Sequence, residues 1–308
     1  MEESVIEVKN FRKTYQNIVA VDDISFEVYR GEIFGLLGPN GAGKTSTLES
    51  LEGLRQPDGG RLSILGIDPS RNPRKLRDLI GVQLQASALP ASMTPSEAMQ
   101  FFCTYHQTAP RFDLLEKFGL DEKKNSQFSL LSTGQQRRLA LALAIAHHPP
   151  VVLLDEPTAG LDVPARVELH GLMDNLRKDG TTIILATHDM AEAEKMSDRV
   201  AILLKGRIAA SGTPTELTAQ GDGLVKISVS SGSSCLLSRP GSFPGVKKQF
   251  QDEVYVTYFS EDAGASVPAI LDFLKTQNDP LVDLRVERPS LEERFLEITK
   301  NKSEPEGN

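Results

Sequence analysis

The chain lacks tryptophan and has only two cysteines, Cys103 and Cys235, among its 308 residues. These cysteines lie far apart and have no neighbours at metal-ligand spacing, which favours reduced thiols in the cytosol. No apolar run approaches the roughly 18–20 residues that a membrane-spanning helix needs. The acidic N-terminus "MEESVIEVKNF" lacks the basic start and apolar run of a signal peptide. The sequence therefore predicts a soluble cytosolic protein.

An excess of positive charge is also absent. The net charge is -8 at pH 7, whereas nucleic-acid-binding domains usually present a basic stripe. We therefore expect no nucleic-acid partner. The composition is that of a globular protein, and 308 residues allow two domains that each bury a core.

Strand and helix patterns alternate along most of the chain, which predicts an α/β fold with a parallel sheet. Residues 1–30 are patterned as antiparallel strands. Further strands are expected at 32–37, 61–65, 79–85, 151–155, 181–187, 200–206 and 207–212. The last two form a hairpin through Lys205–Gly206. No strand pattern occurs between Gln85 and Pro150, so residues 86–150 are expected to form a helical insert.

A polar junction with glycine, at about 213–222, separates this part from a smaller α+β region. Strand patterns follow at 223–230, 253–259 and 282–288, and helix patterns at 266–277 and 290–300. The predicted domains are residues 1–217, a C-terminal accessory domain at 218–300 and a disordered tail at 301–308.

Residues 38–45, "GPNGAGKT", follow an apolar strand, precede a helical pattern and fit the phosphate-binding spacing G-x-x-x-x-G-K-[ST]. The glycines allow successive backbone N–H groups to face one anion, and the helix N-terminus adds its dipole. Lys44 is expected to reach the β- and γ-phosphates of a nucleotide, and Thr45 to offer its hydroxyl to Mg²⁺.

The apolar strand at 151–155 ends in two consecutive acids. Asp155 is placed to bind Mg²⁺, and Glu156 to orient or deprotonate an attacking water. The alternative is that Glu156 only caps the next helix.

Four polar or small residues follow the apolar part of predicted strands, namely Gly38, Gln85, Asp155 and His188. Ligands of open parallel sheets bind outside the carboxyl ends of the strands. We therefore expect these residues to converge on one edge of the sheet, with His188 near the γ-phosphate.

Together these features resemble the ATP-binding subunit of an ATP-binding cassette (ABC) transporter over about residues 4–217. "GPNGAGKT" is similar to Walker A, "VVLLDE" to Walker B, "LSTGQ" (131–135) to the signature and "AGLD" (159–162) to the D-loop. Gln85 resembles the Q-loop residue, His188 the switch histidine and Tyr15 the aromatic that stacks on adenine. For Tyr15 the alternative is an ordinary core aromatic. The implied fold is a P-loop NTPase cassette, a RecA-like core with an antiparallel β subdomain and a helical insert, followed by the α+β domain.

The resemblance implies ATP and Mg²⁺ as ligands. The implied catalytic residues are Glu156, His188 and Gln85, and the implied metal ligands are Thr45, Gln85 and Asp155. The implied nucleotide contacts are Tyr15, Gly38, Pro39, Asn40, Gly41, Ala42, Gly43, Lys44, Thr45, Ser46, Ser132, Thr133, Gly134, Gln135 and Asp162.

Two kinds of partner are also implied by the resemblance. In the family, the signature of one cassette completes the ATP site of another, so a homodimer or a heterodimer of cassettes is expected. The second expected partner is a separate integral-membrane permease, which would place the chain on the cytoplasmic face of the membrane.

The signature motif departs from the usual LSGGQ, because Thr133 replaces the first glycine. A threonine can still donate through its backbone N–H and its hydroxyl. Ser132 and Gln135 also have the spacing of a capping box. Capping does not explain Gly134, which costs roughly 1 kcal/mol against alanine in a helix, whereas a bare backbone would suit the approach of a phosphate.

The C-terminal "RPSLEERFLEITK" (288–300) is similar to the ending of drug- and antibiotic-exporter ATPases that pair with ABC-2-type permeases. The segment is also an ordinary amphipathic helix, and both descriptions can hold. We expect an exporter ATPase that drives its permease through ATP-dependent dimerisation. The alternatives are the ATPase subunit of an importer and a soluble ABC ATPase outside transport.

Overall fold

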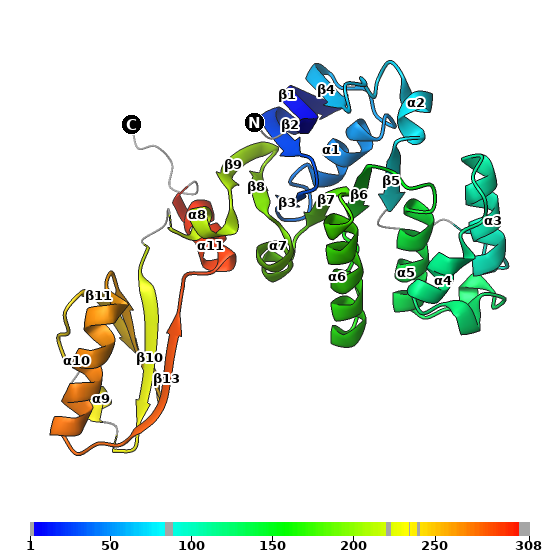
Figure 1. Cartoon of the computed structure of the whole chain (residues 1–308). Coiled ribbons are helices and arrows are strands. Elements are labelled where there is room, and N and C mark those ends of the chain that lie inside the picture. The colour runs from blue at the N-terminus through cyan, green and yellow to red at the C-terminus, as the bar shows by residue number, and fades with distance from the viewer. Residues whose placement is uncertain (1–2, 84–88, 220–222, 234, 239–240, 302–308) are drawn as a thin grey trace. The chain divides into compact units, whose positions relative to one another are not determined.

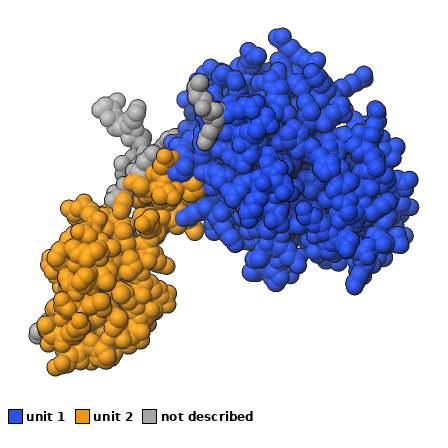
Figure 2. Space-filling model, viewed as in Figure 1, with its two compact units in different colours: residues 1–213 blue, residues 214–308 orange. Residues whose placement is uncertain are grey.

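The computed structural model describes residues 3–83, 89–219, 223–233, 235–238 and 241–301. It contains two compact units, residues 1–213 and residues 214–308 (Figure 2). The expected boundary at 217 lies inside helix α8 (Pro214–Ala219). This helix packs against α11 (Leu291–Asn301), so it belongs with the second unit.

A six-stranded sheet forms the centre of the first unit (Figure 1). Its order is β5-β6-β7-β3-β8-β9, and every neighbouring pair is parallel except the β8–β9 hairpin. The hairpin turns at Lys205 and Gly206, both with positive φ, as a two-residue turn of this type requires. The strands are β3 (Ile33–Leu37), β5 (Ile80–Gln83), β6 (Val151–Asp155), β7 (Thr182–Thr187), β8 (Arg199–Leu204) and β9 (Arg207–Gly212).

Every residue of β3, β6 and β7 is buried, as continuous apolar runs in a parallel sheet should be. The first unit also contains an antiparallel sheet of order β2-β1-β4, built from β1 (Ser4–Tyr15), β2 (Ile18–Tyr29) and β4 (Gly59–Ile64). Helices of this part are α1 (Lys44–Leu51), α2 (Pro73–Arg77), α6 (Val163–Lys178) and α7 (Met190–Met196). The predicted α/β cassette fold is confirmed.

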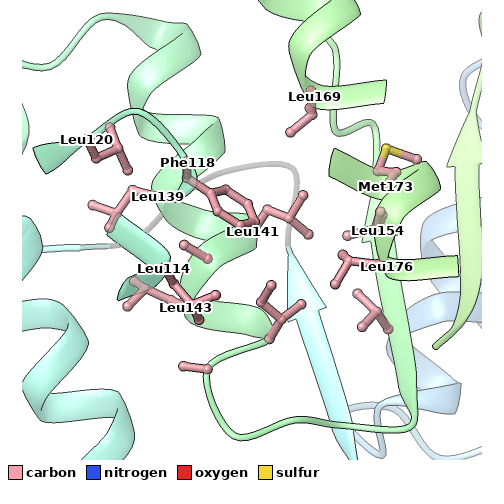
Figure 3. Close-up of a cluster of buried hydrophobic side chains, with 14 of the residues drawn as sticks. Leu114, Phe118, Leu120, Leu139, Leu141, Leu143, Leu154, Leu169, Met173 and Leu176 are labelled. Atoms are coloured by element: carbon pink, nitrogen blue, oxygen red, sulfur yellow. The ribbon is translucent and has the colours of Figure 1, made fainter. Parts of the chain in front are cut away.

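Residues 89–150, the described part of the expected insert, contain helices and no strand. The helices are α3 (Pro95–Tyr105), α4 (Phe112–Lys117), α5 (Thr133–Ala144) and 3₁₀ turns at Asp121–Lys123 and Phe128–Leu130. The capping box at Thr94 and Glu97 begins α3. Apolar side chains of α4 and α5 share one core with Leu154 of β6 and with α6 (Figure 3). This core holds the start of α5 in a fixed relation to the end of β6.

The second unit contains an antiparallel sheet of order β11-β12-β10-β13. Its elements besides α8 and α11 are β10 (Val225–Ser231), α9 (Cys235–Ser238), β11 (Val246–Gln251), β12 (Val256–Ser260), α10 (Ala263–Thr276) and β13 (Leu281–Glu287). Strand β11 was not predicted, because its residues are almost all exposed and show no apolar alternation. Of the expected tail, residue 301 is helical and 302–308 lie outside the described residues.

Within the described ranges, no helix has the length and apolar character that crossing a membrane would need.

Candidate functional site

The loop of residues 38–43 joins β3 to α1 and lies tightly against neighbouring backbone. A Cβ on Gly43 would lie 2.6 Å from the Ala20 carbonyl oxygen, and the residue has a φ of +107°. A Cβ on Gly38 would lie 2.4 Å from the Leu203 carbonyl oxygen. These two glycines are therefore required by the packing of the loop itself. The first turn of α1 contains no acidic residue, which leaves its N-terminus suited to an anion.

Lys44 is buried at the start of α1. Its Nζ donates to the carbonyl oxygen of Gly38 at 2.6 Å and to that of Pro39 at 3.4 Å. The same Nζ lies 3.4 Å from Oε1 of Glu156. Lys44 thus connects the loop of residues 38–43 directly to Glu156, the acid that follows β6.

Asp155 ends β6, and its Oδ2 accepts a hydrogen bond of 3.0 Å from the Thr45 hydroxyl. Its Oδ1 is buried and has no hydrogen-bond partner among the described residues. Burial raises the pKa of Asp155, against the hydrogen bond from Thr45, which lowers it. A buried carboxylate oxygen without a donor, next to a hydroxyl, fits the oxygen ligands that Mg²⁺ prefers.

Glu156 is 5% exposed and has a φ of +50°, a left-handed conformation that few non-glycine residues adopt. Its N–H donates to the Ala186 carbonyl oxygen at 2.9 Å, and its Oε2 lies 2.7 Å from Nδ1 of His188. The hydrogen bond with a carboxylate requires that Nδ1 carry a proton. Helix α6 is capped by Asp162, whose side chain accepts from Ala165 N, so the alternative that Glu156 caps this helix is wrong.

The signature residues begin α5. Ser132 Oγ accepts from Gln135 N at 3.3 Å, and Gln135 Oε1 accepts from Ser132 N at 2.9 Å, which completes the capping box. A Cβ on Gly134 would lie only 3.2 Å from the Cβ of Ala165 in α6. Close packing between the two helices therefore supplies a reason for this glycine that the sequence did not reveal. Ser132 and Thr133 are exposed.

Residues 132–134, 160–162, 164 and 165 line one open cavity of about 440 Å³. Asp162 is among its lining residues, together with the ion pair of Arg138 and Glu168 at 3.1 Å. The signature and the D-loop motif therefore share one surface of the first unit.

Tyr15, at the end of β1, is half-buried rather than a core residue. Lys13 Nζ lies 5.4 Å and Arg55 Cζ 5.9 Å from the centre of its ring. The adenine contact of Tyr15 stays a prediction. Gln85 lies outside the described residues, so its expected position at the edge of the sheet stays a prediction.

Sequence reasoning missed two polar residues near these motifs, one buried and one half-buried. Gln83, the last residue of β5, is 1% exposed, and within the described chain neither of its amide atoms has a hydrogen-bond partner. Burial lowers the pKa of Arg137 of α5, against the nearby charges of Asp155 and Glu156, which raise it. Arg137 stands four residues after Thr133 in the same helix, and that helical spacing was the available signal.

Comparison with known proteins identifies the cassette. A sequence profile of the family described as "ABC transporter" matches residues 21–159. The linearmycin resistance ATP-binding protein LnrL of Bacillus subtilis (strain 168) is 30% identical, over 96% of this chain and 98% of its own. The Nod factor export ATP-binding protein I of Paraburkholderia xenovorans (strain LB400) is 40% identical, over 71% of this chain and 74% of its own.

The probable multidrug ABC transporter ATP-binding protein YbhF of Escherichia coli (strain K12) is 37% identical, over 71% of this chain. The chain spans only 39% of the length of that relative. A solved ATP-binding subunit of an ABC transporter superposes with a TM-score of 0.65 at 30% identity, over 70% of this chain and 93% of its own. A dimeric ATP-binding cassette in a post-hydrolysis state, bound to ADP and Pi, has a TM-score of 0.63 at 27% identity, over 68% of this chain and 98% of its own. The chain therefore belongs to the ABC transporter family and carries its ATP-binding cassette.

Proposed function

We propose that this chain hydrolyses ATP as the cytoplasmic subunit of an exporter and works as a dimer of cassettes on a separate membrane permease. The observation that carries the proposal is the contact of Lys44, Glu156 and His188 beside the phosphate-binding loop. The site combines an ammonium that can bind phosphates, a carboxylate that can activate a water and an imidazole, all at the same strand ends. This combination suits attack of water on a terminal phosphate.

In this mechanism the loop N–H groups and Lys44 bind the phosphates of ATP. Lys44 Nζ lies 3.4 Å from Glu156 Oε1, so a γ-phosphate would compete with that carboxylate for the ammonium. Glu156 would then be free to accept a proton from the attacking water. His188, whose Nδ1 lies 2.7 Å from Glu156 Oε2, would orient the carboxylate. In its doubly protonated form, its Nε2–H would also donate toward the γ-phosphate. Tyr15 would stack on adenine.

The Mg²⁺ site is proposed at Thr45 and Asp155, with Gln85 as a further ligand. The support is the buried Oδ1 of Asp155, which lacks a donor among the described residues. When bound, the cation would neutralise charge that develops on the phosphates.

Dimerisation is proposed through the exposed start of α5 and the D-loop motif. Ser132, Thr133, Gly134 and Gln135 would reach the ATP of a second cassette, identical or different, and Asp162 would face the same contact. ATP would favour the closed dimer because it touches both halves only when they are closed. The dimeric structural relative with ADP and Pi supports this arrangement.

The helical insert is proposed to contact the permease. Leu54 and Tyr105 are more than half exposed and line a cavity of about 220 Å³ between the core of the cassette and α3. Exposed apolar side chains at the rim of a cavity are typical of a protein contact surface. One relative is named as a multidrug ABC transporter ATP-binding protein and another as a Nod factor export ATP-binding protein, and these names favour an exporter over an importer.

The decisive test is Glu156→Gln, with Glu116→Gln on the exposed face of α4 as the matched control. The Glu156 variant should bind ATP, lose at least about a hundredfold in turnover and elute as a dimer only with ATP. Unchanged hydrolysis would show that Glu156 is not the base. Co-purification with a membrane permease supports the transport assignment, and association with only ribosomes or DNA contradicts it.

A further inference from the structure

Glu192 of α7 is a buried acid outside the phosphate site, with 2% of its surface exposed. Its Oε1 accepts hydrogen bonds from Thr158 Oγ1 at 2.7 Å and from His170 Nε2 at 3.0 Å. Thr158 and His170 are buried as well. One carboxylate oxygen therefore connects the turn after Glu156, helix α6 and helix α7.

Stability alone does not explain this buried carboxylate. Taking a carboxylate out of water costs several kcal/mol, and an apolar side chain of similar size would often be as stable. Glu192 Oε2 has no hydrogen-bond partner in the described part of the chain, so the donors converge on Oε1 only. A buried carboxylate that is costly and yet binds two specific donors indicates that the relative position of those donors matters for function.

The contacts of α7 lead directly to His188. Asp189 caps α7 by accepting from Glu192 N at 3.0 Å, and Asp189 Oδ2 accepts from Arg166 Nη1 of α6 at 3.0 Å. His188 precedes this cap and meets Glu156 at 2.7 Å. The first turn of α7 is therefore fixed to α6 immediately beside the imidazole.

Thr158, one of the two donors to Glu192, lies close to Glu156 in the chain. Thr158 follows Glu156 by two residues, in a turn where Ala159 N donates to the Glu156 carbonyl oxygen at 3.2 Å. Glu192 thus fixes both segments whose side chains meet in the Glu156–His188 contact. The same turn continues to Asp162 on the surface proposed for dimerisation.

We infer that Glu192 is a positioning residue for ATP hydrolysis, which holds the His188 segment against the Glu156 segment through Thr158 and His170. The inference rests on the proposed roles of Glu156 and His188. It assigns Glu192 no contact with ATP, so its removal should impair turnover and leave nucleotide binding intact.

The first experiment compares Glu192→Leu with Glu192→Gln. The leucine removes both hydrogen bonds, and we expect kcat to fall about ten- to a hundredfold, because small misplacements at a reacting centre have effects of this size. The KM for ATP should change by less than about twofold. The glutamine keeps a carbonyl oxygen for Thr158 and His170 and should restore most of the rate. Glu194→Gln, an exposed acid of the same helix, is the control.

The second experiment is a double-mutant cycle with His188→Ala. If Glu192 acts through the Glu156–His188 contact, Glu192→Leu should cause a much smaller fold loss of kcat in the His188→Ala background than in the wild-type chain. A merely structural role predicts the same fold loss in both backgrounds, and this result would overturn the inference. A rise in KM with unchanged kcat would overturn it as well.

Two further outcomes separate this inference from the proposed function. If Glu192→Leu fails to fold, Thr158→Val removes one of the two donors and is carried through the same cycle with the same expectation. If Glu156→Gln forms its ATP-dependent dimer but Glu192 and Thr158 variants keep full kcat, the positioning role is refuted while the proposed function stands. A wild-type chain without ATPase activity would refute both.

Discussion

Replacing Gly134 by alanine tests whether this residue serves packing or phosphate binding. The new Cβ would lie 3.2 Å from Ala165 Cβ, closer than the usual carbon contact of about 3.5–4.0 Å. Overpacking of this kind costs about 1–3 kcal/mol. Alanine returns roughly 1 kcal/mol in helix propensity. The net loss of stability should therefore lie between about zero and 2 kcal/mol, and the cassette should fold.

The activity of the same variant should fall far more than its stability. A methyl group at the start of α5 would keep the bare N–H groups from a phosphate, and loss of about 2.7 kcal/mol of transition-state binding is a hundredfold in rate. Ala165→Gly removes the clashing methyl group. The double variant should regain thermal stability while its ATPase rate and ATP-dependent dimer stay low. Recovery of ATPase in the double variant would refute the phosphate role and leave packing alone.

Two titrating groups give further predictions, both checked by unfolding at several pH values. Burial, followed by Glu49 and Asp155, raises the pKa of Glu52 from 4.5 to about 7. The stability that its proton provides is complete below pH 4.5 and is lost as the pH rises through 7, a difference of up to roughly 3 kcal/mol. Glu52→Gln should therefore raise Tm at pH 8 but not at pH 4.5, and an equal gain at both would contradict the burial argument. Burial and the ring of His106, stacked at 3.8 Å, lower the pKa of His147 from 6.5 to about 4. Its contribution is present above pH 6.5 and lost as the pH falls through 4, so His147→Phe should shift acid unfolding to lower pH. No shift would show that another group controls acid unfolding.

The central sheet was predictable because its strands are short apolar runs with sharp ends. Strands β3, β6 and β7 are buried on both faces, so each of their residues carries the signal. Strand β11 is the opposite case. Its residues are almost all exposed, and pairing with β12, which no local pattern reveals, makes it a strand. The unit boundary before Pro214 was not predicted either, because it depends on the packing of α8 against α11, a helix far along the chain.

The same distinction separates the site residues that were found from those that were missed. Residues 38–45 carry the phosphate-loop spacing within one continuous segment, so this pattern is visible in the sequence. Glu192 is one of two acids on a short helix. Its burial and its bonds to Thr158 and His170, 34 and 22 residues away, distinguish it from the exposed Glu194. No local pattern carries that information.

The signature segment shows that a helix cap and a phosphate contact are compatible in the same residues. Ser132 caps α5 by accepting from Gln135 N, which uses a lone pair of the hydroxyl and leaves its proton available to donate. The capping box occupies the N–H groups of Ser132 and Gln135, so the N–H groups of Thr133 and Gly134 between them are not used by the cap. Thr133 adds a side-chain hydroxyl at an exposed position. A helix start that is already rigid can therefore present several donors to a second cassette without losing its own capping bonds.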